Sequence, residues 1–206
     1  MMTENEPLAF SKEEISSLPI EKYTKKIVVV DNEEAAIEAV KFLSRFKTIG
    51  FDTETRPAFR KGTLHQVALV QLATEEVTFL FRINRMGFPP VLKKLLENAA
   101  VTKVGLSLKD DFSALRRLDS IRFDSFIDLQ NLVSKFHISN QALRGIYGVL
   151  FGKRISKTQR LTNWEADTLS EAQKEYAALD AWACLQIYIH LMKYGVTRNA
   201  IETSHE

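Results

Sequence analysis

The stretch that decides the fold lies at residues 48–54 and reads Thr-Ile-Gly-Phe-Asp-Thr-Glu. Two more short apolar stretches follow it, at residues 65–72 and 77–83. The first of these contains the run Val-Ala-Leu-Val, and apolar residues on successive positions indicate a strand that is buried on both faces. Together the three stretches predict three successive strands of a sheet.

Helix-like and strand-like segments alternate on both sides of these strands. Residues 27–30 are a β-branched run, and a helix follows them through Phe42. The last helix begins at the capping box of Ser170 and Gln173 and stops near Gly195. Between these ends the sequence predicts strands at 101–106 and 126–127 and helices at 89–98, 109–118, 141–150 and one ending near residue 136. This order predicts one α/β domain with a mixed sheet flanked by helices.

The bulk composition suits a single folded domain of 206 residues, 45% of them hydrophobic. Residues 1–25 are polar and lack a clear period, so we expect a flexible N-terminal arm, a folded domain over residues 26–195 and a C-terminal tail over residues 196–206. The single cysteine, Cys184, excludes an internal disulfide. No apolar run approaches the ~20 residues that span a bilayer, and no signal peptide is evident, so a cytoplasmic or other reducing intracellular location is expected.

Three acidic residues stand in positions where carboxylates are unexpected. Strand side chains alternate, so Asp52 and Glu54 share one face of their strand. Asp180 lies in the middle of an apolar helical stripe, with Tyr176 one turn earlier on the same side. Two adjacent carboxylates repel each other unless a cation lies between them. Plainer alternatives remain open, namely a solvated acidic strand end and a core aspartate bonded to the backbone or to an arginine.

Three segments together carry a resemblance to a known family. They are Phe-Asp-Thr-Glu-Thr at 51–55, Val-Gly-Leu-Ser-Leu-Lys-Asp-Asp at 104–111 and Tyr-Ala-Ala-Leu-Asp at 176–180. In this order they resemble the three motifs of the DnaQ-like 3′–5′ exonuclease superfamily, in the branch with a tyrosine in the third motif. The branch includes the exonuclease domain of the Werner syndrome protein and, more distantly, ribonuclease D. The resemblance covers residues 26–194 and implies a ribonuclease H-like fold.

The same resemblance implies a set of catalytic residues: Asp52, Glu54, Asp111, Tyr176 and Asp180. The four acids would bind metal, and Asp110 would be a bystander. Oxygen ligands select Mg²⁺ or Mn²⁺, and two ions about 3.5–4 Å apart would clamp the scissile phosphate. Asp52 would bridge both ions, Glu54 and Asp180 would complete the site of the attacking water, and Asp111 would hold the second ion. Tyr176, a poor base at its ordinary pKa near 10, would orient that water.

Basic residues near two of the motifs are candidates for binding nucleic acid. The net charge of +2 neither requires nor excludes such a partner, because local clustering matters more. The candidates for phosphate contact are Arg60, Lys61, Lys153, Arg154, Lys157 and Arg160, and the plainer alternative for each is a solvated surface charge. Trp164 is a candidate for stacking on the terminal base, although the sequence favours the alternative of a packed core tryptophan.

The predicted function is a metal-dependent 3′–5′ exonuclease that acts on the 3′ end of nucleic acid. The resemblance to the Werner domain favours DNA over RNA and leaves room for an unknown helicase or other repair partner. The alternatives are an exoribonuclease of the ribonuclease D type, a phosphodiesterase that acts on small nucleotides, and a catalytically silent nucleic acid-binding module on the same fold. A silent module has no need of unpaired acids that face one another.

Overall fold

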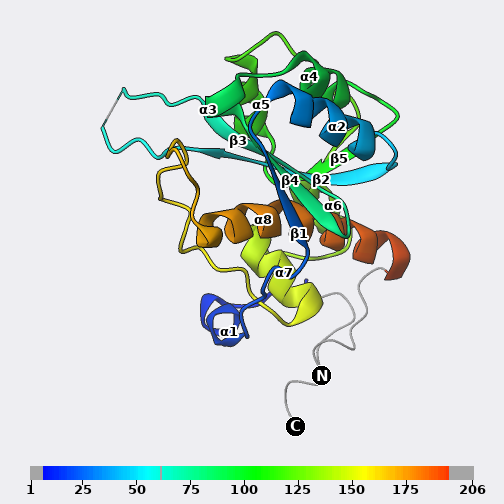
Figure 1. The fold of residues 1–206 in the computed structure, drawn as a ribbon. Coiled ribbons are helices and arrows are strands. Elements are labelled where there is room, and N and C mark those ends of the chain that lie inside the picture. Colours follow the sequence, from blue (N-terminus) through cyan, green and yellow to red (C-terminus); the bar gives the residue numbers. More distant parts are fainter. Residues whose placement is uncertain (1–6, 61, 195–206) are drawn as a thin grey trace, which may run out of the picture.

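A computed structural model describes residues 7–60 and 62–194 of the chain (Figure 1). Within these residues six strands form one sheet, in the order β1-β4-β3-β2-β5-β6. The strands β2, β3 and β4 pair antiparallel in succession, whereas β1 runs parallel to β4, and β5 and β6 continue parallel to β2. Their bounds are β1 Lys26–Val30, β2 Thr48–Thr55, β3 Val67–Ala73, β4 Val77–Arg82, β5 Thr102–Gly105 and β6 Phe126–Asp128. The predicted mixed sheet is confirmed.

Helices cover both faces of the sheet and divide the apolar core into two main layers (Figure 1). The first layer packs α2, α4 and α5 against the sheet, and the second packs α6, α7 and the long α8. The helices are α1 Lys12–Ser17, α2 Glu33–Leu43, α3 Ile83–Met86, α4 Pro90–Leu96, α5 Lys109–Arg116, α6 Leu129–Ser134, α7 Leu143–Phe151 and α8 Glu171–Tyr194. No described helix is long and apolar enough to cross a membrane.

The helix α8 lies directly against β2, and a glycine makes this approach possible. A Cβ atom placed on Gly50 would lie 1.9 Å from the backbone oxygen of Ala181, far inside van der Waals contact. The predicted capping box begins α8, because the Gln173 amide N–H donates to Ser170 Oγ and the Ser170 amide N–H donates to Gln173 Oε1. Gly195, the predicted stop, lies outside the described residues. The close approach brings the centre of α8 onto the middle of β2.

The prediction of a flexible arm over residues 1–25 is wrong for residues 7–25, which pack against the domain. Leu8 pairs with Ile138 and Ile20 pairs with Arg154 through parallel bridges. Between these bridges α1 buries Ile15. A few apolar contacts and backbone hydrogen bonds therefore anchor a segment whose polar composition hides them. Residues 1–6 and the predicted tail at 196–206 lie outside the described residues.

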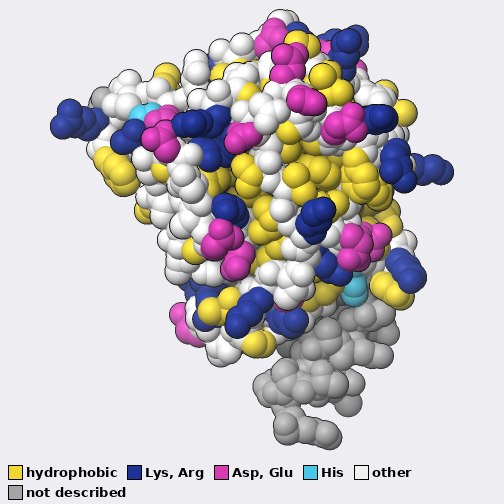
Figure 2. All heavy atoms as spheres, in the orientation of Figure 1, with side chains coloured by type: hydrophobic (Ala, Val, Ile, Leu, Met, Phe, Trp, Pro, Cys, Tyr) yellow, Lys and Arg dark blue, Asp and Glu magenta, His cyan; other side chains and the backbone are white. Residues whose placement is uncertain are grey.

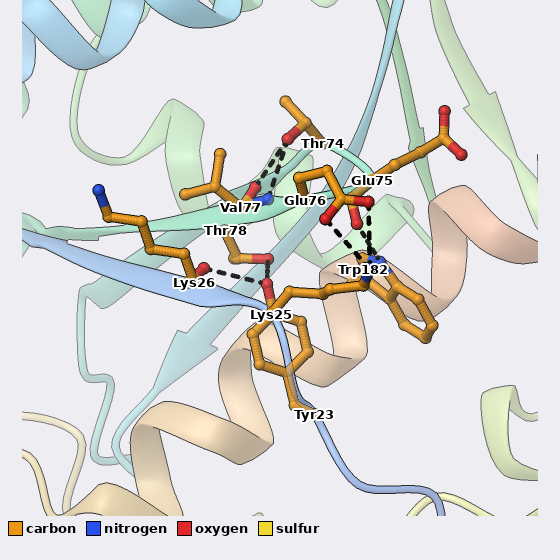
Figure 3. A network of polar contacts seen from close by, with 9 residues as sticks. All are labelled: Tyr23, Lys25, Lys26, Thr74, Glu75, Glu76, Val77, Thr78 and Trp182. Atoms are coloured by element: carbon orange, nitrogen blue, oxygen red, sulfur yellow. Dashed lines mark hydrogen bonds and ion pairs between the residues drawn. The ribbon is translucent and has the colours of Figure 1, made fainter.

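A polar network fixes the end of this N-terminal segment to the sheet and to α8 (Figure 3). The Tyr23 hydroxyl lies 2.8 Å from Thr78 Oγ1 on β4, and its ring meets Trp182 of α8 edge-on, with 6.2 Å between the ring centroids. The Trp182 indole N–H donates to the backbone oxygen of Glu75 at 3.1 Å. Lys25 forms an ion pair with Glu76 at 3.1 Å. The segment is thus tied down at both ends before β1 begins.

Candidate active site

Three carboxylates from two elements converge where α8 crosses β2. Asp52 and Glu54 share the face of β2 that α8 covers, and Asp180 comes from the middle of α8. One carboxylate oxygen from each of the three residues lies within 4.8 Å of the corresponding oxygens of the other two. Glu54 is only 9% exposed and Asp180 only 8% exposed. The geometry therefore gathers three acidic groups in one largely buried cluster.

Burial and mutual repulsion make this cluster unfavourable when it is fully charged. Burial raises the pKa of Asp52 well above its ordinary value, and the charges of Asp180, Glu54 and Asp111 raise it further. Burial, followed by Asp180 and Asp111, raises the pKa of Glu54 to about 9. Burial also raises the pKa of Asp180 to about 7, although Tyr176 and Lys157 act in the opposite direction. The cluster lacks positive charge of its own.

The residues fit a divalent cation. Asp180 Oδ1 is buried and has no hydrogen-bond partner in the described part of the chain. A buried carboxylate oxygen without a partner is unfavourable unless a cation or another donor satisfies it. The cluster consists of hard oxygen ligands, which suit Mg²⁺ or Mn²⁺. A cation there would relieve the repulsion among the carboxylates.

Of the two adjacent aspartates that begin α5, only Asp111 turns toward the acids. Asp111 is half-buried and accepts a short hydrogen bond from the Thr53 hydroxyl of β2, whereas Asp110 is exposed. Burial raises the pKa of Asp111 to about 6 against the lowering effect of Thr53. Asp111 lies outside the tight cluster of three, although its charge raises the pKa of both Asp52 and Glu54. This arrangement favours Asp111 over Asp110 as the fourth acid.

The loop before α5 is held by Asp128, a residue for which no local sequence pattern indicates a role. Asp128 accepts hydrogen bonds from the backbone N–H groups of Ser107 and Leu108, at 3.0 and 2.9 Å. It also caps α6 through the N–H of Gln130. Because Ser107 has a positive φ of 59°, the turn needs such support. Asp128 thereby fixes the direction in which α5 presents Asp111.

Tyr176 interacts with the carboxylate of Asp180 one turn later on α8. Burial raises the pKa of the Tyr176 phenol well above its ordinary value, and the charges of Asp180, Glu54 and Asp52 raise it further. The phenol therefore remains protonated at neutral pH. A protonated phenol can donate a hydrogen bond at this site and cannot act as a base.

A cavity of about 550 Å³ opens beside Asp180 and Tyr176. Its other walls carry Lys157, Arg160 and Arg144, and none of these cations forms an ion pair with any described residue. The charge of Lys157 lowers the pKa of Asp180, and that of Arg160 lowers the pKa of Glu54. On the face that Figure 2 shows, acidic and basic side chains are interspersed. The cavity thus combines free cations with an acidic wall.

The other predicted nucleic acid contacts are placed differently. Lys153 forms an ion pair with Glu21, and Arg154 Nε donates to the backbone oxygen of Leu18, so the N-terminal segment engages both. Arg60 is exposed in the loop between β2 and β3, and Lys61 lies outside the described residues. Of the five basic candidates that the structure describes, only Lys157 and Arg160 line the cavity.

The stacking role considered for Trp164 is wrong, and the favoured alternative, a packed core tryptophan, is confirmed. Its side chain is 0% exposed and belongs to an apolar cluster with Leu80 and Ala177. Its ring lies 6.0 Å from the ring of Tyr176, measured between centroids. A fully buried ring offers no free face to a base, so Trp164 supports Tyr176 from within the core.

Several residues at or near the site escaped the sequence analysis. Gln71 of β3 is paired with Asp52 in the sheet, is fully buried, and has no described partner for either polar atom of its amide. Glu165 draws together Arg56 and His65, each 3.1 Å away. Arg144 lines the cavity. Only the pairing of strands and the packing of distant segments place these residues, so no local pattern marks them.

Comparison with known proteins agrees with this geometry. The sequence profile of a family described as 3′-5′ exonuclease matches residues 27–195, most of the chain. The chain belongs to the 3′–5′ exonuclease family. The resemblance to the 3′–5′ exonuclease family, the ribonuclease H-like fold and the assignment as an exonuclease are therefore confirmed.

Individual relatives of this exonuclease are longer proteins. The bifunctional 3′-5′ exonuclease/ATP-dependent helicase WRN of Mus musculus is 36% identical over 161 residues, which are 75% of this chain and 12% of that protein. DNA polymerase I of Aquifex aeolicus is 30% identical over 162 residues, 77% of this chain and 26% of that protein. The solved structure of Escherichia coli RNase D, an exoribonuclease, shares the fold with a TM-score of 0.73 at 23% identity, covering 82% of this chain and 44% of that one.

Proposed function

We propose that this exonuclease hydrolyses phosphodiester bonds at the 3′ end of DNA with two bound Mg²⁺ or Mn²⁺ ions. The observation that carries the proposal is the buried cluster of Asp52, Glu54 and Asp180 beside a cavity lined with unpaired cations. Asp111, held by Thr53, would complete the ligand set. DNA is favoured because sequence relatives include a DNA polymerase I and a helicase fused to an exonuclease.

Each side chain has a role that follows from its charge and position. When bound, the ions would act as Lewis acids on the phosphate and lower the pKa of a bound water. The four carboxylates would hold the ions, and Tyr176, kept protonated, would donate a hydrogen bond that orients the attacking water. Lys157 and Arg160 attract the phosphates of the strand into the cavity. Bound metal would screen the negative charge of the carboxylates, so the negatively charged phosphates of the strand could approach them.

A degradation assay tests the proposal directly. Single strands of DNA and RNA of one sequence, labelled at either the 3′ or the 5′ end, are incubated with the protein with and without Mn²⁺ and run on a gel. We expect a ladder of shortened 5′-labelled DNA, immediate release of label from 3′-labelled DNA, and no reaction in EDTA. Faster degradation of RNA would reverse the assignment of substrate. Absence of degradation of both strands would favour the silent binding module.

Metal should stabilise this protein more strongly as the pH rises. In the unfolded chain carboxyl groups have a pKa near 4, whereas in the folded, metal-free protein burial and repulsion raise the pKa of Glu54 to about 9 and that of Asp180 to about 7. The folded state therefore holds protons that the unfolded state has lost. The stability due to these groups is complete below about pH 4 and decreases as the pH rises toward 9.

Divalent cations replace these protons, so we expect the increase in Tm on adding Mn²⁺ to be larger at pH 8 than at pH 6. At saturating Mn²⁺ and pH 8 the gain should be about 5 °C or more, since ~1 kcal/mol corresponds to roughly 2–4 °C in a chain of this size. Differential scanning fluorimetry with and without EDTA measures both effects. A Tm that does not change on adding Mn²⁺, or an increase in Tm that is larger at pH 6 than at pH 8, would contradict the metal assignment.

Replacing Tyr176 by phenylalanine should lower kcat by roughly 10²-fold with little change in strand affinity. The phenol orients the water, and the ring that packs near Trp164 is retained in the variant. Single-turnover rates and binding in EDTA separate the two quantities. Tyr188→Phe, a half-buried tyrosine further along α8, is the matched control and should retain the parent rate. If strand affinity fell and kcat did not, Tyr176 would be a substrate contact.

A further inference from the structure

Arg144, at the start of α7, has the surroundings of an anion-binding residue. It lines the cavity that Asp180 and Tyr176 also line. Its Nε is buried and has no hydrogen-bond partner in the described part of the chain. The same side chain forms no ion pair with any described carboxylate. A guanidinium with a buried free donor and no counter-ion is unfavourable unless a ligand supplies the acceptor.

The orientation of Arg144 is set from the N-terminal segment. Its Nη2 donates to Ser16 Oγ at 3.1 Å, and that hydroxyl in turn donates to the backbone oxygen of Lys12 at 2.7 Å. Because the Ser16 hydroxyl donates its proton to Lys12, its oxygen accepts the hydrogen bond from Arg144. The helix α1 itself is anchored by the buried side chain of Ile15, close to Gly148 of α7. Part of the guanidinium is thereby fixed, and Nε remains available.

Neighbouring groups on the cavity wall suit an anion as well. No side chain caps the N-terminus of α7, where Ala142 and Leu143 line the cavity, so backbone N–H groups and the helix dipole add to the positive potential. Lys157 and Arg160 lie on the same cavity and form no ion pair with any described residue. Gln130 and Gln141 supply neutral amides on this wall. The cavity is lined by three cations and by Asp180, one of the acids that would hold metal.

We propose that Arg144, held by Ser16, binds a non-scissile phosphate of the nucleic acid strand. This inference rests on the proposed function, because the cluster of Asp52, Glu54 and Asp180 marks where the scissile phosphate would lie. A 3′-terminal nucleotide brings only that one phosphate to the site. A second phosphate in the cavity must therefore belong to the strand on the 5′ side. The N-terminal segment, which precedes the matched residues 27–195, thus completes the substrate site.

The test measures binding of a 5′-fluorescein single-stranded DNA by anisotropy in EDTA, over a series of KCl concentrations. Arg144→Gln should weaken binding about 10-fold, the scale of one hydrogen bond to a charged group. The slope of log K against log[salt] should decrease by about 0.7, the value for one phosphate contact to a single strand. Arg144→Lys keeps the charge without the planar fork and should lie between the parent and Arg144→Gln. Parent affinity and slope in Arg144→Gln would overturn the proposal.

Matched controls isolate the role of Ser16. Ser16→Ala should weaken binding about 3-fold, because the guanidinium loses a hydrogen bond that fixes it. Ser17→Ala removes a neighbouring hydroxyl that donates only to the backbone oxygen of Glu14 and should have no effect. Arg45→Gln removes an exposed arginine just beyond α2, outside the cavity, and should also bind as the parent does. Equal losses in Ser16→Ala and Ser17→Ala would refute positioning by Ser16.

Two further measurements separate this proposal from the proposed function. Inhibition by a nucleoside 5′-monophosphate in Mn²⁺ should be the same in the parent and in Arg144→Gln, since that product carries only one phosphate. If Arg144→Gln weakened inhibition by the monophosphate as much as it weakens binding of DNA, Arg144 would contact the scissile phosphate and the assignment would be overturned. The gain in Tm with Mn²⁺ should also be unchanged in the variant. If the parent binds DNA through Arg144 and degrades no strand, the proposed function fails and the phosphate site stands.

Discussion

An Asp52→Asn variant should degrade 3′ ends about 10⁴-fold more slowly than the parent, the scale on which enzymes lose rate when one member of a catalytic unit is removed. A carboxylate oxygen of Asp52 lies within 4.8 Å of one from Glu54 and one from Asp180. Burial raises the pKa of Asp52 more than any single neighbour does. An amide in its place removes negative charge that would hold the proposed cations. The measurement is the single-turnover rate in Mn²⁺ on 5′-labelled DNA.

The same variant should remain folded. The substitution removes one of the repelling charges from the cluster, so the Tm of the metal-free protein at pH 8 should rise by roughly 2–4 °C, about 1 kcal/mol, while the gain on adding Mn²⁺ disappears. Asp110→Asn is the matched control, because it removes a charge from an exposed aspartate beside Asp111. It should keep the activity of the parent. Full activity in Asp52→Asn would refute the site.

Gly50→Ala should be among the most destabilising single substitutions in the chain. The added methyl group would lie 1.9 Å from the backbone oxygen of Ala181, and a backbone atom cannot move aside as a flexible side chain can. Either α8 shifts away from β2 or the strand bends. We expect a loss of about 3 kcal/mol or more, the upper part of the range for overpacking, and a decrease in Tm of roughly 10 °C.

This substitution should also lower activity in the fraction that stays folded, because a shift of α8 moves Asp180 away from Asp52 and Glu54. Urea titration followed by circular dichroism gives the stability, and the degradation assay below the Tm gives the rate. Gly148→Ala is the control, since its methyl group would meet the end of the Leu18 side chain at 3.0 Å, which can yield. Equal stability of the two variants would show that α8 does not depend on Gly50.

The parts of the site that the sequence reveals are those that local geometry determines. Strand alternation places Asp52 and Glu54 on one face without reference to the rest of the fold, and the 3.6-residue period places Asp180 one turn from Tyr176. The capping box of Ser170 and Gln173 is likewise local, and it is present as predicted. Motif order then identifies the family, so the architecture could be predicted before any coordinates.

The features that were missed depend on contacts between distant segments. Trp164 is aromatic and lies in a basic stretch, yet the turn that carries it folds inward under Tyr176. Arg144 looks like any helical surface residue until Ser16, 128 positions earlier, meets its guanidinium. The basic residues Lys153 and Arg154 are engaged by a segment that composition alone describes as an arm. Charge and composition alone cannot show which basic side chains have an N–H group without a hydrogen-bond acceptor in the folded protein.

The anchored N-terminal segment means that the region matched by the exonuclease family and the packed domain have different borders. The family match begins at residue 27, but bridges from Leu8 and Ile20 reach across to loops that follow α6 and α7. A truncation designed on the family border would uncover the apolar side of α7 that Ile15 and Leu18 cover. Protein engineers who transplant this nuclease into fusions should therefore start no later than Pro7.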